Sequence, residues 1–391
     1  MLKYMTHFDR SLCLLALASV LAAAPPPLRF REHTITKDLK FGYQLAAADL
    51  NGDGRIDLIA VDERGVELVW FENPGWQRHV IAADVPRTIN VDCADIDGDG
   101  VPEIAILFRF ESRPDKSVGI VSLLRHEGDV RRPWKATEID RVPTAHRVRW
   151  ANIDGTGKRV MVMAPMVGLK AEPPEYNASV PIFLYRPGVW KRELVSEELR
   201  GILHSIYPMD WDGDKRQELL TASFLGLRLF RPAPDSGWQS RQIAQGAPEP
   251  CPKCGSSEVA EGRLGKRRFL AAIEPWHGHQ VTIYLERKGV WQRNVIDSSF
   301  QNAHALAVGD LDRDGRDEVV AGYRGPGFQL YIYRAQDQAG ERWRRETLDA
   351  GGIAAADCKI RDFNGDGRLD IACIGASTAN LKWYENLGAG K

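Results

Sequence analysis

Short apolar segments alternate with polar turns along almost the whole chain, and the pattern repeats about every fifty residues. The clearest unit has HALAVG leading into an acidic loop, EVVAGY and FQLYIYR on either side of the turn RGPG, and WRRETL at its end. Apolar segments this short, punctuated by glycine, are typical of β-strands. The pattern therefore predicts four strands in each unit.

Each unit closes with an aromatic residue followed five positions later by an aliphatic one. The copies begin at Phe30, Trp76, Trp134, Trp190, Trp238, Trp291 and Trp343. Positions five apart face opposite sides of a regular strand, so we expect a bulge here or burial against two different neighbours. Because the tryptophans recur in almost every unit, we interpret them as packing residues rather than a sugar-binding platform.

The second marker is an acidic loop of the form D-x-[DN]-x-D-G-x-x-[DE]. Oxygen atoms at positions one, three, five, seven and nine would converge on a hard cation such as calcium, and glycine at six permits the turn. Two copies are degraded, from Asn152 and Glu261, and Lys215 replaces the glycine in a third. The predicted calcium ligands are Asp49, Asn51, Asp53, Asp57, Asp95, Asp97, Asp99, Glu103, Asp210, Asp212, Asp214, Glu218, Asp310, Asp312, Asp314, Glu318, Asp362, Asn364, Asp366 and Asp370.

A solvated acidic turn is the alternative for these loops, but carboxylates this close repel one another without a cation. We expect calcium to stabilise the blades rather than to catalyse, because a catalytic ion would face the channel and usually keep an open position.

Seven units of four strands predict an all-β fold, a seven-bladed β-propeller over residues 28–386. The last unit ends without its closing strand, and the segment FREHTI from Phe30 supplies one. We therefore expect the N-terminal strand to complete the last blade and close the ring, which an open solenoid would not require.

The segment FGYQLAAADLNGDGRIDLIAV, residues 41–61, and its copies resemble the FG-GAP or VCBS repeats, whose members include the integrin α-chain heads. This resemblance implies a propeller with calcium in its blade loops, in a family of adhesion heads, secreted proteins and enzymes. The phrase IEPWHGHQVTIY, residues 273–284, is similar to the propeller of aldos-2-ulose dehydratase, a carbon–oxygen lyase that acts on oxidised sugars. A shared fold by itself implies little about chemistry.

Histidines recur at one position of the repeat, six residues before the acidic loop. This slot holds His146, His204 and His304 in three units, and Tyr43, Ile89 and Ala356 in three others. It lies at the start of the innermost strand, which lines the channel of a propeller. The turn EPWHGHQ adds His277 and His279 on the same face, opposite the acidic loops. We expect the five histidines to converge at one mouth of the channel.

Converging imidazoles can bind zinc or another divalent transition metal, and the predicted ligands are His204, His277, His279 and His304. His146 or Tyr323 would take a proton, while Arg324 or Arg147 would orient anionic groups. This reading predicts a metal-dependent lyase or dehydratase that acts on a sugar or sugar derivative. Two alternatives stay open. Each histidine could merely bond a neighbouring blade's backbone, or the face could bind a carbohydrate or a protein without catalysis.

The start of the chain predicts export. Lys3 and Arg10 precede an apolar run, residues 11–24, that is too short to span a bilayer, so residues 1–22 are interpreted as a signal peptide. We therefore expect a secreted or periplasmic protein with no membrane insertion. The 52 basic and 53 acidic residues are nearly balanced, without a basic run that would favour a nucleic-acid partner.

Cys251 and Cys254 form the one close cysteine pair. A zinc knuckle needs a second pair of ligands nearby, so a local disulfide is favoured. Cys93, Cys358 and Cys373 have no obvious partner in the sequence.

Overall fold

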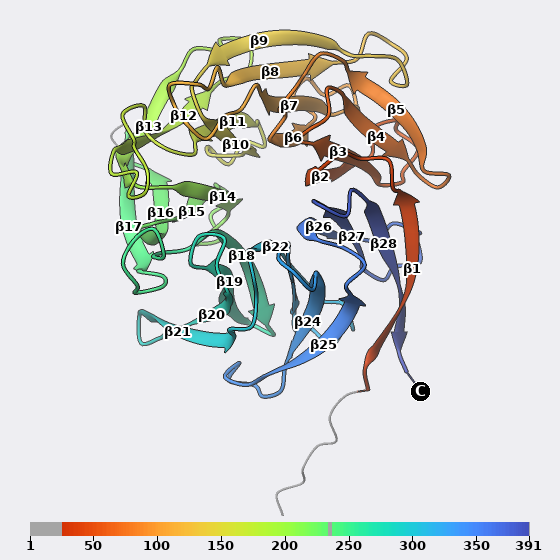
Figure 1. Ribbon diagram of the computed structural model, residues 1–391, viewed down its shortest axis with the longest axis vertical. Helices are drawn as coiled ribbons and strands as arrows, with labels where there is room; N and C mark the ends of the chain where they lie inside the picture. Colours follow the sequence, from red (N-terminus) through yellow and green to blue (C-terminus); the bar gives the residue numbers. More distant parts are fainter. Residues whose placement is uncertain (1–25, 234–236, 391) are drawn as a thin grey trace, which may run out of the picture.

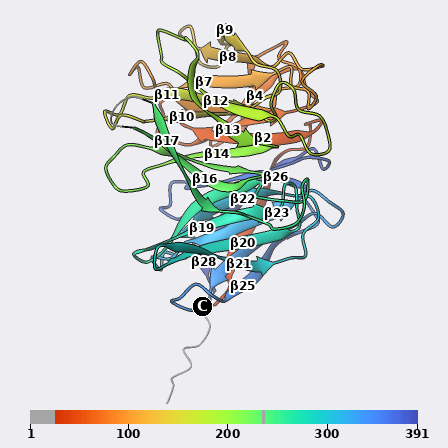
Figure 2. The ribbon, with the colours of Figure 1, turned by 90° about the vertical axis from the view of Figure 1, so that its left-hand side faces the viewer.

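A computed structural model describes residues 26–233 and 237–390, and the predicted signal peptide lies outside them. All regular elements of this described part are β-strands, which form seven four-stranded antiparallel sheets. Figure 1 shows the sheets as blades of a ring, and Figure 2 shows the ring from the side. The predicted all-β, seven-bladed propeller is confirmed. Within the described residues, no helix is long and apolar enough to cross a membrane.

Successive strands of a blade run outward from the axis. Blades 1 to 4 comprise β2 (Gly42–Ala48), β3 (Asp57–Asp62), β4 (Leu68–Glu72) and β5 (Gln77–Ala82); β6 (Asn90–Ala94), β7 (Glu103–Phe108), β8 (Ile120–Arg125) and β9 (Lys135–Arg141); β10 (Ala145–Ala151), β11 (Val160–Pro165), β12 (Ser179–Tyr185) and β13 (Glu193–Arg200); and β14 (Leu203–Met209), β15 (Glu218–Ser223), β16 (Gly226–Pro232) and β17 (Trp238–Ala244). Blades 5 to 7 comprise β18 (Glu258–Leu264), β19 (Arg267–Glu274), β20 (Gln280–Arg287) and β21 (Val290–Asp297); β22 (Ala303–Gly309), β23 (Glu318–Tyr323), β24 (Gln329–Ala335) and β25 (Trp343–Ala350); and β26 (Ala355–Arg361), β27 (Asp370–Gly375), β28 (Leu381–Ala389) and β1 (Leu28–Thr36).

The first and last strands of the chain close the ring together. β1 pairs antiparallel with β28, from Leu28 opposite Ala389 to Thr36 opposite Leu381. The two strands, red and blue in Figure 1, lie side by side although they come from opposite ends of the chain. The predicted closure of the last blade by the N-terminal strand is confirmed.

A β-bulge explains the five-residue spacing of the closing motif. In every outer strand pair the register shifts at the aliphatic residue, so that this residue has no partner opposite it. The seven residues are Ile35, Ile81, Ile139, Val195, Ile243, Ile296 and Leu348. One extra residue in a strand turns the side chains beyond it to the other face. The aromatic and the aliphatic residue can therefore both pack inward.

Tyrosines of third strands bind aspartates of the preceding blade. The hydroxyl of Tyr185 donates to Asp140 at 2.6 Å, and that of Tyr333 donates to Asp297 at 2.6 Å. Tyr384 donates to Asp349 in the same way at 2.7 Å. Each bond joins neighbouring blades, whose hydrophobic contacts otherwise hold them together.

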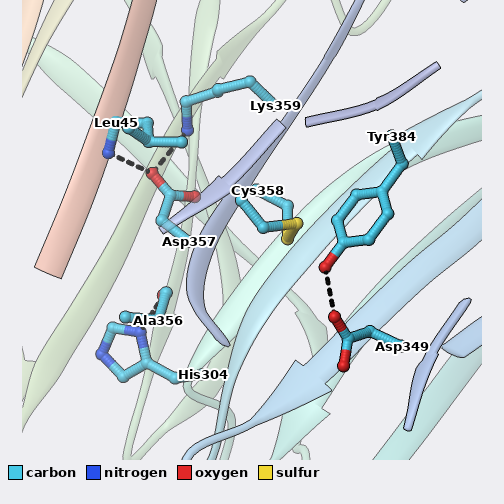
Figure 3. Close-up of a disulfide and its surroundings, with 9 residues drawn as sticks. Leu45, His304, Asp349, Ala356, Asp357, Cys358, Lys359 and Tyr384 are labelled. Atoms are coloured by element: carbon cyan, nitrogen blue, oxygen red, sulfur yellow. Dashed lines mark hydrogen bonds and ion pairs between the residues drawn. A yellow bond between two sulfur atoms is a disulfide. The ribbon is translucent and has the colours of Figure 1, made fainter. Parts of the chain in front are cut away.

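Two disulfides are present in the described part of the chain. Cys251 bonds Cys254, as the sequence favoured. The second bond joins Cys358 and Cys373, which lie directly opposite each other on β26 and β27. Figure 3 shows it close to Ala356 and His304. This pair could not be predicted from the sequence, because only the strand register brings the two residues together.

Candidate functional site

A bulge in the innermost strand presents each slot residue to the propeller axis. In blades 1, 3, 4, 6 and 7 the pairing of the first two strands skips one residue, namely Tyr43, His146, His204, His304 and Ala356. Blades 2 and 5 pair here without a shift. Bulges re-aim side chains and are common beside functional sites. The slot recognised in the sequence is thus a repeated irregularity of the backbone.

Three histidines from three blades form a compact cluster. The Nε2 atoms of His204 and His277 are 3.1 Å apart. The ring centroid of His304 lies 5.1 Å from that of His204 and 5.2 Å from that of His277. One nitrogen from each ring lies within 4.8 Å of the other two. Tetrahedral zinc holds its nitrogen ligands at about 2.0–2.1 Å, hence roughly 3.3 Å from each other, so small ring movements would complete the site.

In two of these rings the second nitrogen has a polar partner. His204 Nδ1 lies 2.9 Å from a carboxylate oxygen of Glu258, and His304 Nδ1 donates to the backbone carbonyl of Ala356. Both bonds place the acceptor lone pair on Nε2, which in His204 also lies 3.4 Å from the Arg147 guanidinium. In the described part of the chain, Nε2 of His304 is buried without a hydrogen-bond partner. Metal-binding histidines are typically held in this way, by a carboxylate or carbonyl at the second nitrogen.

Burial keeps the imidazoles neutral. It lowers the pKa of His204 to about 4, with a further contribution from the Arg147 charge. Burial also lowers the pKa values of His277 and His304 well below the usual range, and nearby charges, including that of Arg324, add to the effect. Neutral imidazole is the form that ligates metals.

A second group of polar side chains adjoins the cluster. His146 Nε2 lies 3.2 Å from the Tyr43 hydroxyl, and the His146 ring centroid is 5.0 Å from that of His204. Arg147 contacts His146 and donates to Glu258 at 2.9 Å. Burial alone would raise the pKa of Glu258, but Arg147 and His204 lower it to about 2. Glu258 is therefore ionised and binds both the arginine and the histidine.

A cavity of about 30 Å³ lies on the axis, lined in part by Tyr43, Arg147, Glu258 and His304. A cavity needs roughly 10–15 Å³ to hold one water molecule, so this space can hold water between the two groups of side chains. Towards the solvent, His277 and Arg324 are only partly buried. They form the accessible side of the site.

Two residues predicted for the site lie outside the cluster. His279 is exposed, and its Nε2 contacts the side chain of Gln280 at 3.3 Å. Tyr323 is packed in an apolar core, with its ring centroid 5.0 Å from that of Phe300. Because neighbouring residues of a turn or strand point in different directions, proximity in sequence to His277 or Arg324 did not bring these side chains inward.

Two residues of the site were not assigned roles from the sequence. Tyr43 occupies the slot in blade 1, so its place at the channel could be read from the repeat, but its role could not. Glu258 lies in blade 5, whose acidic loop has lost its consensus aspartates. Its position within the repeat could therefore not be aligned with the other units. Its sequence signal was weak, because the inner strand EVAEGRL carries a second glutamate and an arginine as well.

The acidic loops share one backbone arrangement. The carboxylate at position one accepts amide hydrogen bonds within the loop, as Asp49 does from Gly54 at 2.8 Å. The carboxylate at position nine accepts the amide of position two, as Glu318 does from Leu311 at 2.8 Å. Three carboxylate groups converge within 4.8 Å in three loops: Asp95, Asp97 and Asp99; Asp210, Asp212 and Glu218; Asp310, Asp312 and Glu318.

The chemistry of these loops fits a cation. Burial, with the charges of neighbouring carboxylates, raises the pKa of Asp57 to about 7, of Asp370 to about 6 and of Glu318 to about 8. Carboxylates in this condition gain most from a bound divalent ion. Lys215 adopts the left-handed φ of 73° that glycine has in the other loops, which costs free energy and marks that copy as strained.

The loops differ in the third-strand residue beside position nine. Blades 2, 4 and 6 carry an arginine there, and Arg125 lies 3.2 Å from Glu103 while Arg334 contacts Asp312 and Glu318. Blades 1 and 7 carry Glu72 and Glu385 instead. Arginine partly neutralises the carboxylates of blades 2, 4 and 6, whereas Glu72 of blade 1 is itself paired with Arg131 and Glu385 of blade 7 with Arg31.

Two family models match the chain. Residues 49–106 match the FG-GAP-like repeat, and residues 118–288 match the β-propeller domain of aldos-2-ulose dehydratase. The second match includes His146, His204, Glu258 and His277.

One curated relative is aldos-2-ulose dehydratase of Phanerodontia chrysosporium, which is 25% identical over 323 residues. The alignment covers 73% of this chain and 35% of the relative, so the chain spans about a third of the length of that protein. Both resemblances drawn from the sequence are therefore confirmed: the chain is a seven-bladed propeller with FG-GAP-like repeats, similar in sequence to the propeller of aldos-2-ulose dehydratase.

Proposed function

We propose that this protein is a secreted, metal-dependent lyase or dehydratase that acts on a sugar or an oxidised sugar. One observation carries the proposal: His204, His277 and His304 each place one ring nitrogen within 4.8 Å of the other two, while Glu258 and the Ala356 carbonyl contact the second nitrogen of two rings. Three protein ligands leave one position of a tetrahedral ion for a substrate oxygen.

The similarity to a sugar dehydratase supports carbohydrate chemistry at this site. The family match covers His204 and the turn with His277, two of the three histidines of the cluster, and ends before His304. The alignment covers only 35% of the relative, so the activity of that whole protein does not by itself apply to this chain.

The roles follow from position. Zinc or another divalent ion, held by the three histidines, would supply a Lewis acid for a carbonyl or carboxylate oxygen. His146 is deprotonated at neutral pH, because burial and Arg147 lower its pKa, and it accepts a proton from a carbon of the substrate. Hydroxide leaves the adjacent carbon as a carbon–carbon double bond forms, and it takes the proton from His146, so that water is released and His146 is neutral again. Tyr43, rather than Tyr323, is the hydroxyl within reach of His146.

Calcium in the acidic loops and export of the chain belong to the same proposal. The crowded carboxylates, whose pKa values burial and neighbouring charges raise in blades 1, 6 and 7, support calcium. The two disulfides support an oxidising compartment outside the cytoplasm, where such bonds form and persist.

Metal analysis of purified protein tests the proposal. We expect about one ion of zinc or another divalent transition metal per chain, in addition to calcium. His277→Ala should lose that ion, whereas His279→Ala, two residues away and exposed, should keep it. Metal-loaded protein should then release a product with new ultraviolet absorbance from aldos-2-uloses or uronic sugars. Calcium alone, or a transition metal that survives His277→Ala, would refute the metal centre, and calcium alone would favour a non-catalytic binding propeller.

A further inference from the structure

Arg324 differs from three other buried or partly buried arginines of the propeller, which are paired with carboxylates. Arg147 is paired with Glu258 at 2.9 Å, and Arg293 is paired with Glu274 at 2.7 Å. Arg334 contacts three carboxylates of its own blade. No carboxylate of the described residues lies within ion-pair distance of Arg324, although Nε of its guanidinium is buried and without a hydrogen-bond partner.

The position of Arg324 makes this charge part of the site. The residue directly follows β23, its backbone amide donates to the Asn302 carbonyl at 3.0 Å, and its Nη2 donates to the Asn302 side chain at 3.1 Å. The guanidinium carbon lies 6.0 Å from the centroid of the Tyr43 ring, over its face. The side chain is thus fixed beside the slot residues and keeps donors free.

Partial burial of a cation without a counter-ion is costly, and proteins normally pair such a cation or keep it for a ligand. Glu258 contacts Arg147 and His204 and has no ion pair with Arg324. The site therefore carries an excess positive charge before any metal is bound. The planar guanidinium fork matches a carboxylate, which accepts two parallel hydrogen bonds.

We propose that Arg324 selects a substrate with a carboxylate, so that the ligand is an acidic sugar derivative of the uronic or aldonic type rather than a neutral sugar. This inference deepens the proposed function and rests on its site. It assigns Arg324 to substrate binding and leaves Arg147 as a structural partner of Glu258.

Equilibrium binding tests the inference without relying on catalysis. D-galacturonate and D-galactose differ by the carboxylate, and their binding can be compared by ligand-observed magnetic resonance and calorimetry. Hydrogen bonds to charged groups are worth about 1.5–3 kcal/mol, which corresponds to roughly tenfold to a hundredfold in affinity. We expect galacturonate to bind more tightly than galactose by that factor, and Arg324→Gln to remove the difference. Arg324→Lys should keep part of it.

The control is Arg132→Gln, which removes a positive charge from a side chain that is 83% exposed and paired with Asp129 outside the site. Circular dichroism would verify that all variants are folded. Equal binding of the two sugars, or a preference that survives Arg324→Gln, would overturn the inference. Preference for D-galactose 6-phosphate over galacturonate would also overturn it, because the anion would then be a phosphate.

Repeating the titrations with and without transition metal, in calcium buffer, separates the two proposals. An Arg324-dependent preference in metal-free protein that binds no transition metal supports this inference while the metal centre fails. Zinc binding that requires His277, together with equal binding of galactose and galacturonate, supports the metal centre and overturns the inference on Arg324.

Discussion

Glu258 links the two groups of side chains at the site. Its carboxylate contacts Nδ1 of His204 and the guanidinium of Arg147, both at 2.9 Å. The first contact leaves Nε2 of His204 available to a metal, and the second keeps Arg147 against His146. A single carboxylate thereby fixes the tautomer of a ligand and the position of the predicted base.

Glu258→Gln should weaken metal binding and lower stability together. The amide preserves the size of the side chain but removes the charge that binds the His204 N–H. Loss of such a partner typically lowers metal affinity by about 10–100-fold. It also leaves Arg147 buried without a counter-ion, for which we expect a loss of about 3 kcal/mol in the free energy of unfolding. Competition with a chromogenic zinc chelator and chemical denaturation measure the two effects.

The exposed Glu286 lies on the next-but-one strand of the same blade, and Glu286→Gln is the matched control with no expected effect. Unchanged zinc affinity in Glu258→Gln would show that the carboxylate does not support a ligand. Reduced stability with full zinc affinity would restrict its role to Arg147.

Strands place these side chains through one repeated irregularity. The inner bulge occurs in five blades, and the residue it displaces is tyrosine, histidine or alanine according to the blade. The outer bulge occurs in all seven and always displaces an aliphatic residue. The same kind of bulge therefore recurs around the ring, and the residue that it displaces packs in the core at the rim but lies at the proposed site at the axis in blades 1, 3, 4 and 6.

Ile81→Ala should show that the outer bulge serves packing. Ile81 is 0% exposed and lies in the largest core cluster, so its truncation leaves a cavity and should cost about 2–5 kcal/mol of unfolding free energy. Urea denaturation measures this cost. Val290→Ala, at the start of the closing strand of blade 5, removes methyl groups from a residue that is 63% exposed and should change stability by less than about 0.5 kcal/mol. Equal effects of the two substitutions would contradict the packing role.

The whole fold was predictable from sequence because its information is repeated. Seven copies of one pattern indicate the number of strands, the number of blades and the closure by β1. Where one copy is degraded, its strands can be identified by comparison with the intact copies. The site was predictable only where it follows the repeat, as at His204 and His304. Glu258, the inward direction of His277 and the outward direction of His279 depend on one turn and one inner strand of blade 5, for which no second copy exists.

Calcium should stabilise the whole ring more at high pH than at low pH. Without calcium, burial raises the pKa of Asp57 to about 7 and of Glu318 to about 8, above their ordinary values of 3.8 and 4.5. The folded protein then binds more protons than the unfolded chain between about pH 4 and pH 8, so its stability falls as the pH rises through this range. Bound calcium requires the ionised carboxylates and offsets their repulsion, which removes the loss.

Scanning calorimetry in calcium and in chelator, at pH 5 and pH 8 and after removal of transition metals, measures the effect. We expect the calcium-induced rise in Tm to be larger at pH 8. The buried histidines, whose low pKa values reduce stability as the pH falls below about 6.5, act equally in both samples and cancel in the difference. Asp57→Asn should reduce the pH dependence seen in chelator, because the amide cannot ionise. A rise in Tm that is the same at both pH values would contradict the predicted role of carboxylate ionisation, and no rise at pH 8 would show that the acidic loops hold the ring together without calcium.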